Sequence, residues 1–86
     1  MKIFYTQTAV RQLAKLPKLA QLRIAGKMRF YTSQPDPLVF AETLADCKTY
    51  RFRIGDYRVI CQNQDGTVRI LIVVTVGHRR NVYRNF

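Results

Sequence analysis

The first third of the chain shows one strand-like segment followed by two helix-like segments. Residues 2–5 are predicted to form a short strand. Apolar side chains then recur at helical spacing as far as Pro17, and Thr6 or Thr8 can cap the start of that helix. Pro17 can also open a second helix, which is expected to end before the turn-forming segment 33–37. The pattern therefore predicts a helical hairpin after one strand.

The second helix is expected to bury one apolar stripe and to keep its basic side chains in water. The predicted stripe comprises Leu19, Leu22, Ala25, Met28 and Phe30, and the basic positions are Lys18, Arg23, Lys27 and Arg29. Segment 38–45, which follows the turn, has no pattern that assigns it to a helix or to a strand.

Beyond Lys48 the hydrophobic period changes to two. Segments 50–54 and 57–61 alternate apolar and polar residues, and Gly55-Asp56 forms the turn between them. Asp65-Gly66 gives a second hairpin signal, and segment 67–76 is aliphatic and β-branched, as expected of a central strand covered on both faces. The order predicts an α+β fold: the N-terminal strand and an antiparallel three-stranded meander form one sheet, packed on the helical hairpin.

Composition limits the functions that are possible. The 86 residues form one predicted domain, 1–86, which is too small to enclose a large cofactor, so none is expected. The formal charge of +10 indicates a polyanionic partner, either nucleic acid or an acidic protein. The apolar runs are too short for a membrane span or a signal peptide, so a cytoplasmic location is expected. Cys47 and Cys61 lack metal or disulfide spacing and are expected to be buried thiols.

The predicted hairpin brings arginines together. A two-residue turn at Gly55-Asp56 places Arg53 directly opposite Arg58, with Arg51 on the same face. Like charges directly opposite each other destabilise a sheet unless something offsets the repulsion, and the planar donors of arginine suit a phosphodiester. The alternative is that these arginines simply extend into water. The opposite face of the hairpin is predicted to hold Tyr50, Phe52, Ile54, Tyr57, Val59 and Cys61.

A second basic cluster ends the chain and includes the single histidine, His78. Histidine, tyrosine and arginine together suit acid–base chemistry on a phosphodiester, although a solvated basic tail is an alternative. If Asp65-Gly66 is a two-residue turn, Arg58 faces Val73 and Arg79 lies about 20 Å farther along, so a bend or bulge would have to bring it back.

Three motifs resemble those of RelE-type toxins from bacterial and archaeal toxin-antitoxin pairs. They are Lys15-Leu16-Pro17, the hairpin sequence of residues 50–60 with its basic positions and Gly-Asp turn, and the ending Val76-Gly77-His78-Arg79-Arg80-Asn81-Val82-Tyr83. The resemblance covers nearly the whole chain. It implies a metal-independent endoribonuclease that cleaves mRNA codons in the ribosomal A site, and an acidic RelB-like antitoxin as partner. It further implies attack by the ribose 2′-hydroxyl, which leaves a 2′,3′-cyclic phosphate and a 5′-hydroxyl.

The resemblance also suggests roles for individual residues. Arg51 and Arg53 would be basic catalytic residues and Arg58 would stabilise the transition state. Arg79 would act on the phosphate or in proton transfer, and Tyr83 would stack on a base. We expect further RNA contacts from Lys48, Arg80 and Arg84.

Proton transfer is the step at which this sequence departs from its relatives. The family pattern has lysines at the positions of Arg51 and Arg53, and an arginine with a pKa above about 12 is a poor general base. Arg51 and Arg53 would then hold the phosphate. His78 is our hypothesis for the acid–base group, because histidine has an ordinary pKa of about 6.5. The alternatives are a ParE-like toxin, which shares the fold but poisons DNA gyrase, and a non-catalytic RNA-binding or inactive relative.

Overall fold

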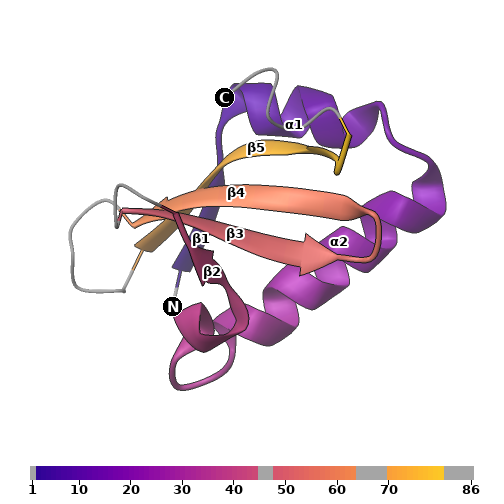
Figure 1. Ribbon diagram of the computed structural model, residues 1–86. Helices are drawn as coiled ribbons and strands as arrows, with labels where there is room; N and C mark the ends of the chain where they lie inside the picture. The colour runs from indigo at the N-terminus through magenta and orange to yellow at the C-terminus, as the bar shows by residue number, and fades with distance from the viewer. Residues whose placement is uncertain (1, 45–47, 64–69, 81–86) are drawn as a thin grey trace.

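The computed structural model describes residues 2–44, 48–63 and 70–80. Its strands form one sheet in the order β1-β5-β4-β3-β2, in which β1 is parallel to β5 and the other neighbours are antiparallel. The predicted α+β class is confirmed. The described part of segment 38–45, which no pattern assigned, contains most of a 3₁₀ helix that begins at Pro37 and the edge strand β2. The elements are β1 (Lys2–Tyr5), α1 (Gln7–Ala14), α2 (Lys18–Thr32), η1 (Pro37–Phe40), β2 (Glu42–Thr43), β3 (Thr49–Ile54), β4 (Tyr57–Asn63) and β5 (Ile70–His78) (Figure 1).

Helix α1 begins as its sequence predicts. The hydroxyl of Thr6 accepts a hydrogen bond from the backbone N–H of Ala9 at 3.1 Å, which satisfies one of the free donors at the helix start. The side-chain carbonyl of Gln12 accepts a hydrogen bond from the N–H of Val76 at 2.8 Å. This contact attaches α1 to β5.

The predicted stripe of α2 is wrong. Of its members only Met28 is buried, while Leu19, Leu22 and Phe30 are exposed. The reason is that α2 carries apolar residues on opposite faces, so helical spacing alone cannot select the face that meets the sheet. The residues that α2 buries are Ala20, Ile24, Met28 and Thr32, and its basic residues Lys18, Arg23, Lys27 and Arg29 are exposed as predicted.

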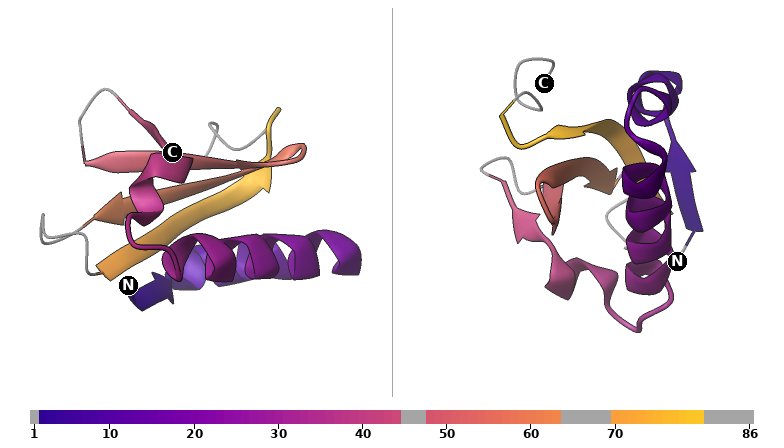
Figure 2. Two further views of the ribbon diagram at one scale, coloured as in Figure 1. Left: turned by 90° about the horizontal axis from the view of Figure 1, so that it is seen from below. Right: turned by 90° about the vertical axis from the view of Figure 1, so that its right-hand side faces the viewer.

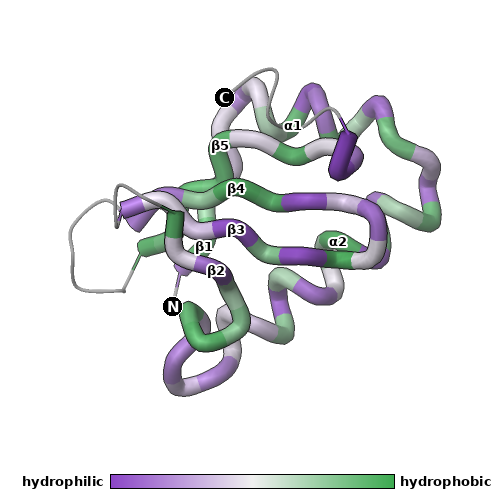
Figure 3. Tube along the Cα trace, in the orientation of Figure 1, coloured by the Kyte–Doolittle hydropathy of each residue, from purple (hydrophilic) through white to green (hydrophobic). Residues whose placement is uncertain are grey.

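The hydrophobic core lies between the sheet and α2, which runs along one face of the sheet (Figure 2). Hydrophilic and hydrophobic positions alternate along β3 (Figure 3). Accordingly Phe52 is fully buried between its exposed or half-buried arginine neighbours. Burial raises the pKa of the Cys61 thiol, which therefore stays protonated and inert. The predicted inward face is buried at Phe52, Ile54, Val59 and Cys61 and half-buried at Tyr50 and Tyr57.

No helix in the described part of the chain is long and apolar enough to cross a membrane. Cys47 and the Asp65-Gly66 dipeptide lie outside the described residues.

The pairing of β4 with β5 differs from the prediction. Arg58 lies opposite Gly77 rather than Val73, and Asn63 pairs with Leu71, so the connection between the strands is longer than a two-residue turn. The register also shifts between Ile60 and Cys61, which adds an irregularity of the β-bulge type. As a result, the end of β5 lies beside the β3–β4 turn.

Candidate active site

Two rows of side chains cross the sheet on the face opposite the core. In the row nearer the β3–β4 turn, Arg53 lies opposite Arg58, as the sequence predicts, and Arg58 lies opposite Gly77. In the next row Arg51 lies between Glu42 on β2 and Ile60 on β4. Cross-strand partners share a face of the sheet, so the three predicted arginines of the hairpin do form one cluster.

Arg58 lies over the turn that precedes its strand. Its Nη1 atom donates hydrogen bonds to the carbonyl oxygens of Gly55 and Tyr57, both at 2.9 Å. Gly55 has a φ of +59°, a left-handed conformation that favours glycine. A Cβ atom at Gly55 would lie 3.1 Å from Nη1 of Arg23, so this α2 guanidinium packs against the same turn. Arg23 was not among the predicted site residues, because its position on a distant helix gives no sequence signal.

Arg79 also reaches this turn. Its backbone N–H donates to the carbonyl oxygen of Asp56 at 2.8 Å, and its Nη1 lies 3.8 Å from the Asp56 carboxylate. The predicted separation of about 20 Å from the residue facing Arg58 is therefore wrong, because the observed register places Gly77 opposite Arg58. The turn thus gathers guanidinium groups from α2, β4 and the end of β5.

Glu42, like Arg23, was not among the predicted site residues. Its two carboxylate oxygens contact two guanidiniums: Oε2 pairs with Nη2 of Arg51, and Oε1 lies 2.6 Å from Nε of Arg53. The hydrogen bond from Arg51, together with the nearby charges of Arg53 and Arg58, holds the pKa of the Glu42 carboxyl below its ordinary value. Nothing in the local pattern of segment 38–45 indicated this contact.

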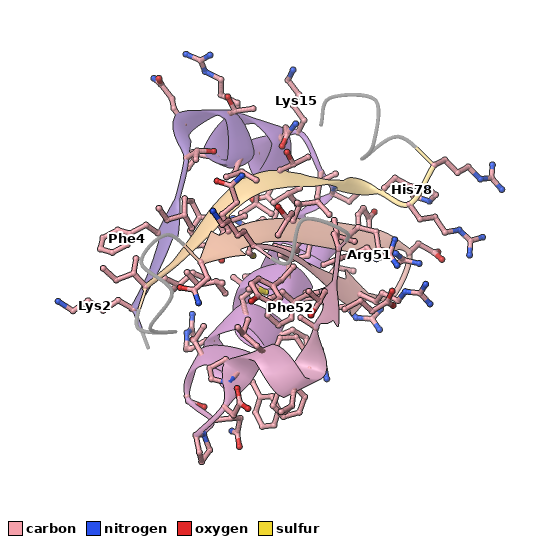
Figure 4. All side chains as sticks on the ribbon, turned by 60° about the vertical axis from the view of Figure 1, so that its left-hand side comes forward. Lys2, Phe4, Lys15, Arg51, Phe52 and His78 are labelled. Carbon is pink, nitrogen blue, oxygen red and sulfur yellow. The ribbon has the colours of Figure 1, made fainter. Side chains whose placement is uncertain are left out.

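His78 ends β5 opposite Tyr57, so it shares the inward face of the hairpin and not the face of Arg53 and Arg58. The rings of His78 and Tyr57 lie 5.9 Å apart in an edge-to-face arrangement. The Nδ1 atom of His78 accepts a hydrogen bond from the backbone N–H of Arg80 at 3.2 Å. In a neutral ring, Nε2 therefore carries the proton. Figure 4 shows His78 and Arg51 toward one side of the molecule, away from Lys2 and Phe4 of β1.

The other residues predicted to contact RNA do not all lie at the β3–β4 turn. Arg80 is exposed and directly follows Arg79 after the end of β5. Lys48 is exposed but precedes β3 at its start, so it lies at the end of the strand far from the Gly55 turn. Tyr83 and Arg84 lie outside the described residues, and their roles stay predictions.

A second surface lies on the outer face of α2. Leu19, Leu22 and Phe30 are 82%, 60% and 50% exposed, and the space above Gly26 is open. These residues recur at helical spacing and we name them the α2 stripe. Monomeric proteins seldom expose contiguous apolar surface without a binding role, so this face is a candidate protein-binding surface.

Comparison with known proteins places the chain in a family. The family model of the ParE toxin of type II toxin-antitoxin systems matches residues 3–83. The chain belongs to this toxin family. No curated protein matches this member of the ParE toxin family.

Solved structures of RelE-type toxin systems share the fold of this ParE-family toxin. A chain of the RelBE2 toxin-antitoxin complex from Mycobacterium tuberculosis matches with a TM-score of 0.71 and 26% identity, covering 91% of this chain and 96% of that one. The RelB-RelE complex from Methanococcus jannaschii gives a TM-score of 0.73 at 21% identity, covering 96% and 98%. The intact E. coli RelBE complex gives 0.71 at 18% identity, covering 90% and 94%. The predicted resemblance to RelE-type toxins of the RelE/ParE superfamily is confirmed.

Proposed function

We propose that this toxin is a metal-independent endoribonuclease that cleaves mRNA in the ribosomal A site and thereby arrests translation in the cytoplasm. The observation that carries the proposal is the convergence of Arg53, Arg58 and Arg79 at one turn of an open sheet face. Such a group of guanidiniums suits the charged phosphate of a phosphodiester, and it stabilises the additional charge of a pentavalent transition state.

The proposed reaction assigns a task to each element of the site. The ribose 2′-oxygen bonds to phosphorus while the bond from phosphorus to the 5′-oxygen breaks, which yields a 2′,3′-cyclic phosphate and a 5′-hydroxyl. The net proton movement is from the 2′-hydroxyl to the 5′-oxygen. Arg51 and Arg53 hold the phosphate, Arg58 and Arg79 stabilise the transition state, and Tyr83 stacks on a base. Additional phosphate contacts come from Lys48, Arg80 and Arg84.

His78 is the proposed proton-transfer residue. Because its Nδ1 accepts the N–H of Arg80, Nε2 is the ring nitrogen left to exchange a proton with the RNA. Donation to the leaving 5′-oxygen requires the imidazolium form, which gives up the hydrogen bond from Arg80.

A second candidate function is supported by the matched family. ParE-like toxins poison DNA gyrase, and the family model that matches residues 3–83 carries the ParE name. A gyrase-binding toxin needs no group of arginines at this turn, whereas this sheet brings Arg58 and Arg79 to the Gly55 turn. This juxtaposition favours the nuclease.

The deciding experiment is expression of the chain in growing bacteria, followed by primer extension on cellular transcripts. The nuclease predicts new 5′ ends within translated codons, which disappear with Arg58→Ala. Intact transcripts accompanied by DNA damage would instead establish the ParE-like function. Growth arrest with neither cleaved transcripts nor DNA damage would support a non-catalytic RNA-binding module.

We further propose that an acidic antitoxin neutralises this toxin. The similar solved chains come from RelB-RelE complexes, and the chain has a net charge of +10. The α2 stripe is flanked by exposed Arg23 and Lys27, so an amphipathic segment with acidic borders would complement it. The antitoxin is therefore expected to cover α2 as well as the arginine face.

A further inference from the structure

Glu42 lies at the β2 edge of the sheet face that carries Arg51, Arg53 and Arg58, although the chain has few acids. The whole sequence contains five acidic residues against 15 basic ones. Two of the acids in the described segments, Glu42 and Asp56, pair with arginines of the proposed site. Glu42 bridges Arg51 and Arg53, which are the two arginines assigned to hold the RNA phosphate.

Packing elsewhere in the fold delivers Glu42 to this position. The ring of Tyr31 on α2 stacks on Phe52 at 5.2 Å and on Phe40 at 5.0 Å between centroids, which secures η1 against the core. Strand β2 starts two residues after Phe40 and pairs with β3, so that Glu42 lies directly opposite Arg51. The carboxylate is therefore positioned by the fold rather than by chance contact.

The carboxylate uses the donors that a phosphate would need. Two carboxylate oxygens on two guanidiniums reproduce the charge-assisted contacts that two non-bridging phosphate oxygens would make. A guanidinium N–H that donates to Glu42 is not available to donate to an RNA phosphate. We propose that Glu42 is an intramolecular occupant of the phosphate site, which holds Arg51 and Arg53 in place until a phosphodiester displaces it.

Displacement is physically easy at this edge. Strand β2 is two residues long and both residues are exposed. The Glu42 side chain is 45% exposed, and exposed ion pairs are weak because water and salt compete with them. Arg51 is the better-anchored partner, since its side chain is 20% exposed. The carboxylate can therefore rotate away while the arginines stay on the sheet.

The same contacts make Glu42 a poor proton acceptor. Both of its oxygens face guanidiniums, and the cationic neighbours lower the pKa of its carboxyl. A weaker base gains less from taking the proton of a 2′-hydroxyl. Occupation of the phosphate site and general-base catalysis therefore predict opposite results for a neutral substitute.

The test measures binding of an RNA that cannot be cleaved. This inference rests on the proposed function, so a fluorescent oligoribonucleotide fully 2′-O-methylated is titrated into wild-type toxin, Glu42→Gln and the control Asp36→Asn. Asp36 has the same charge, and none of the ion pairs in the described segments involves it. Glu42→Gln should bind about three- to tenfold more tightly, and its salt dependence should steepen by about one in slope. Asp36→Asn should change affinity less than about twofold.

A second probe separates this inference from the proposed function. Inorganic pyrophosphate is titrated while the Nε–Hε signals of Arg51 and Arg53 are followed by NMR, which also checks that each variant is folded. The pyrophosphate concentration at the midpoint of the titration should be lower for Glu42→Gln than for wild-type toxin. For Glu42→Asp it should lie between these two values, because the shorter side chain is expected to reach the arginines less well. If Glu42→Gln binds pyrophosphate more tightly but wild-type toxin cleaves no mRNA, the inference about Glu42 is supported and the proposed nuclease function is wrong.

Two results would overturn the inference. Equal or weaker binding of both probes by Glu42→Gln would show that Glu42 does not compete with phosphate, even if wild-type toxin cleaves mRNA. Unchanged binding with loss of single-turnover cleavage on ribosomes would make Glu42 a catalytic base instead.

Discussion

The arginine-bearing end of the outer sheet face and the outer face of α2 both present exposed side chains, yet they are built for different partners. On the sheet, Arg53 lies opposite Arg58, and carboxylates from β2 and from the β3–β4 turn pair with the neighbouring arginines. On α2, large apolar side chains are exposed between lysines and arginines, and residues 1–34 contain no acidic side chain. The first face suits an anion and the second suits an acidic amphipathic protein segment.

The proposed catalytic contacts and the proposed antitoxin contacts thus lie on separate surfaces of one small domain. Repulsion between Arg53 and Arg58 is offset within the fold by Glu42, so the sheet face is stable before substrate arrives. On the α2 stripe, Phe30 packs against Tyr31 and Phe40, but the side chains of Leu19 and Leu22 stay largely exposed to water. We therefore expect the free toxin to be less soluble than its antitoxin complex.

The largest expected effect is on the free energy of unfolding, and it should differ between the two faces of α2. Ile24→Ala should lower the free energy of unfolding by about 2–5 kcal/mol, because Ile24 is fully buried against the sheet. Leu22→Ala, on the α2 stripe, should change it by less than about 0.5 kcal/mol. Urea denaturation measures both. Equal losses would mean that the stripe is packed in the folded chain.

Next in size is the loss of an arginine from the sheet face. Arg58→Ala should slow mRNA cleavage on ribosomes about 100-fold or more with nearly unchanged ribosome binding, because its contact strengthens in the transition state. Arg11→Ala removes the same charge from an exposed position on α1 and serves as the control. Single-turnover kinetics would refute the assignment if the two variants cleaved alike.

Substitution of His78 tests whether the end of β5 supplies a proton-transfer group to the proposed site. His78→Ala should reduce the cleavage rate about 100-fold, since removal of a general acid or base typically costs at least this much. The rate is to be measured from pH 6 to pH 8. A variant that cleaves at the wild-type rate across that range would exclude histidine and leave proton transfer to an arginine or to ribosomal RNA.

The α2 stripe is tested with the antitoxin. Leu22→Glu should weaken toxin–antitoxin binding about tenfold or more, because it places a charge in an apolar contact facing an acidic partner. Free toxin should remain folded, as Leu22 is exposed. Isothermal titration calorimetry gives the affinity, with Lys15→Gln on the preceding turn as a control that lowers the net charge by the same one unit. Unaltered affinity would place the antitoxin elsewhere.

The smallest effect concerns stability and pH. Because its arginine partners lower the pKa of Glu42 below the ordinary 4.5, Glu42 stabilises the fold above that pH, and this contribution is lost as the pH falls through the lowered value. Wild-type toxin should therefore melt slightly above Glu42→Gln at pH 7, and the difference should vanish in acid. A constant difference at every pH would show that the effect does not come from the charge.

The local sequence was sufficient to predict the structural elements whose geometry depends on residues close together in the chain. The hydroxyl of Thr6 is within reach of the first turn of α1, so the cap follows from residues three positions apart. The Gly55-Asp56 turn likewise determines the register of β3 and β4, so Arg53 had to lie opposite Arg58.

Tertiary structure decided the contacts between segments far apart in the chain. The β4–β5 register includes an irregularity between Ile60 and Cys61 and pairs Arg58 with Gly77, and it brings Arg79 to the β3–β4 turn. Glu42 reaches Arg51 only because stacked aromatic rings hold η1 against the core. The buried face of α2 was settled by the sheet, because a helix with apolar residues on two sides has no face of its own to prefer.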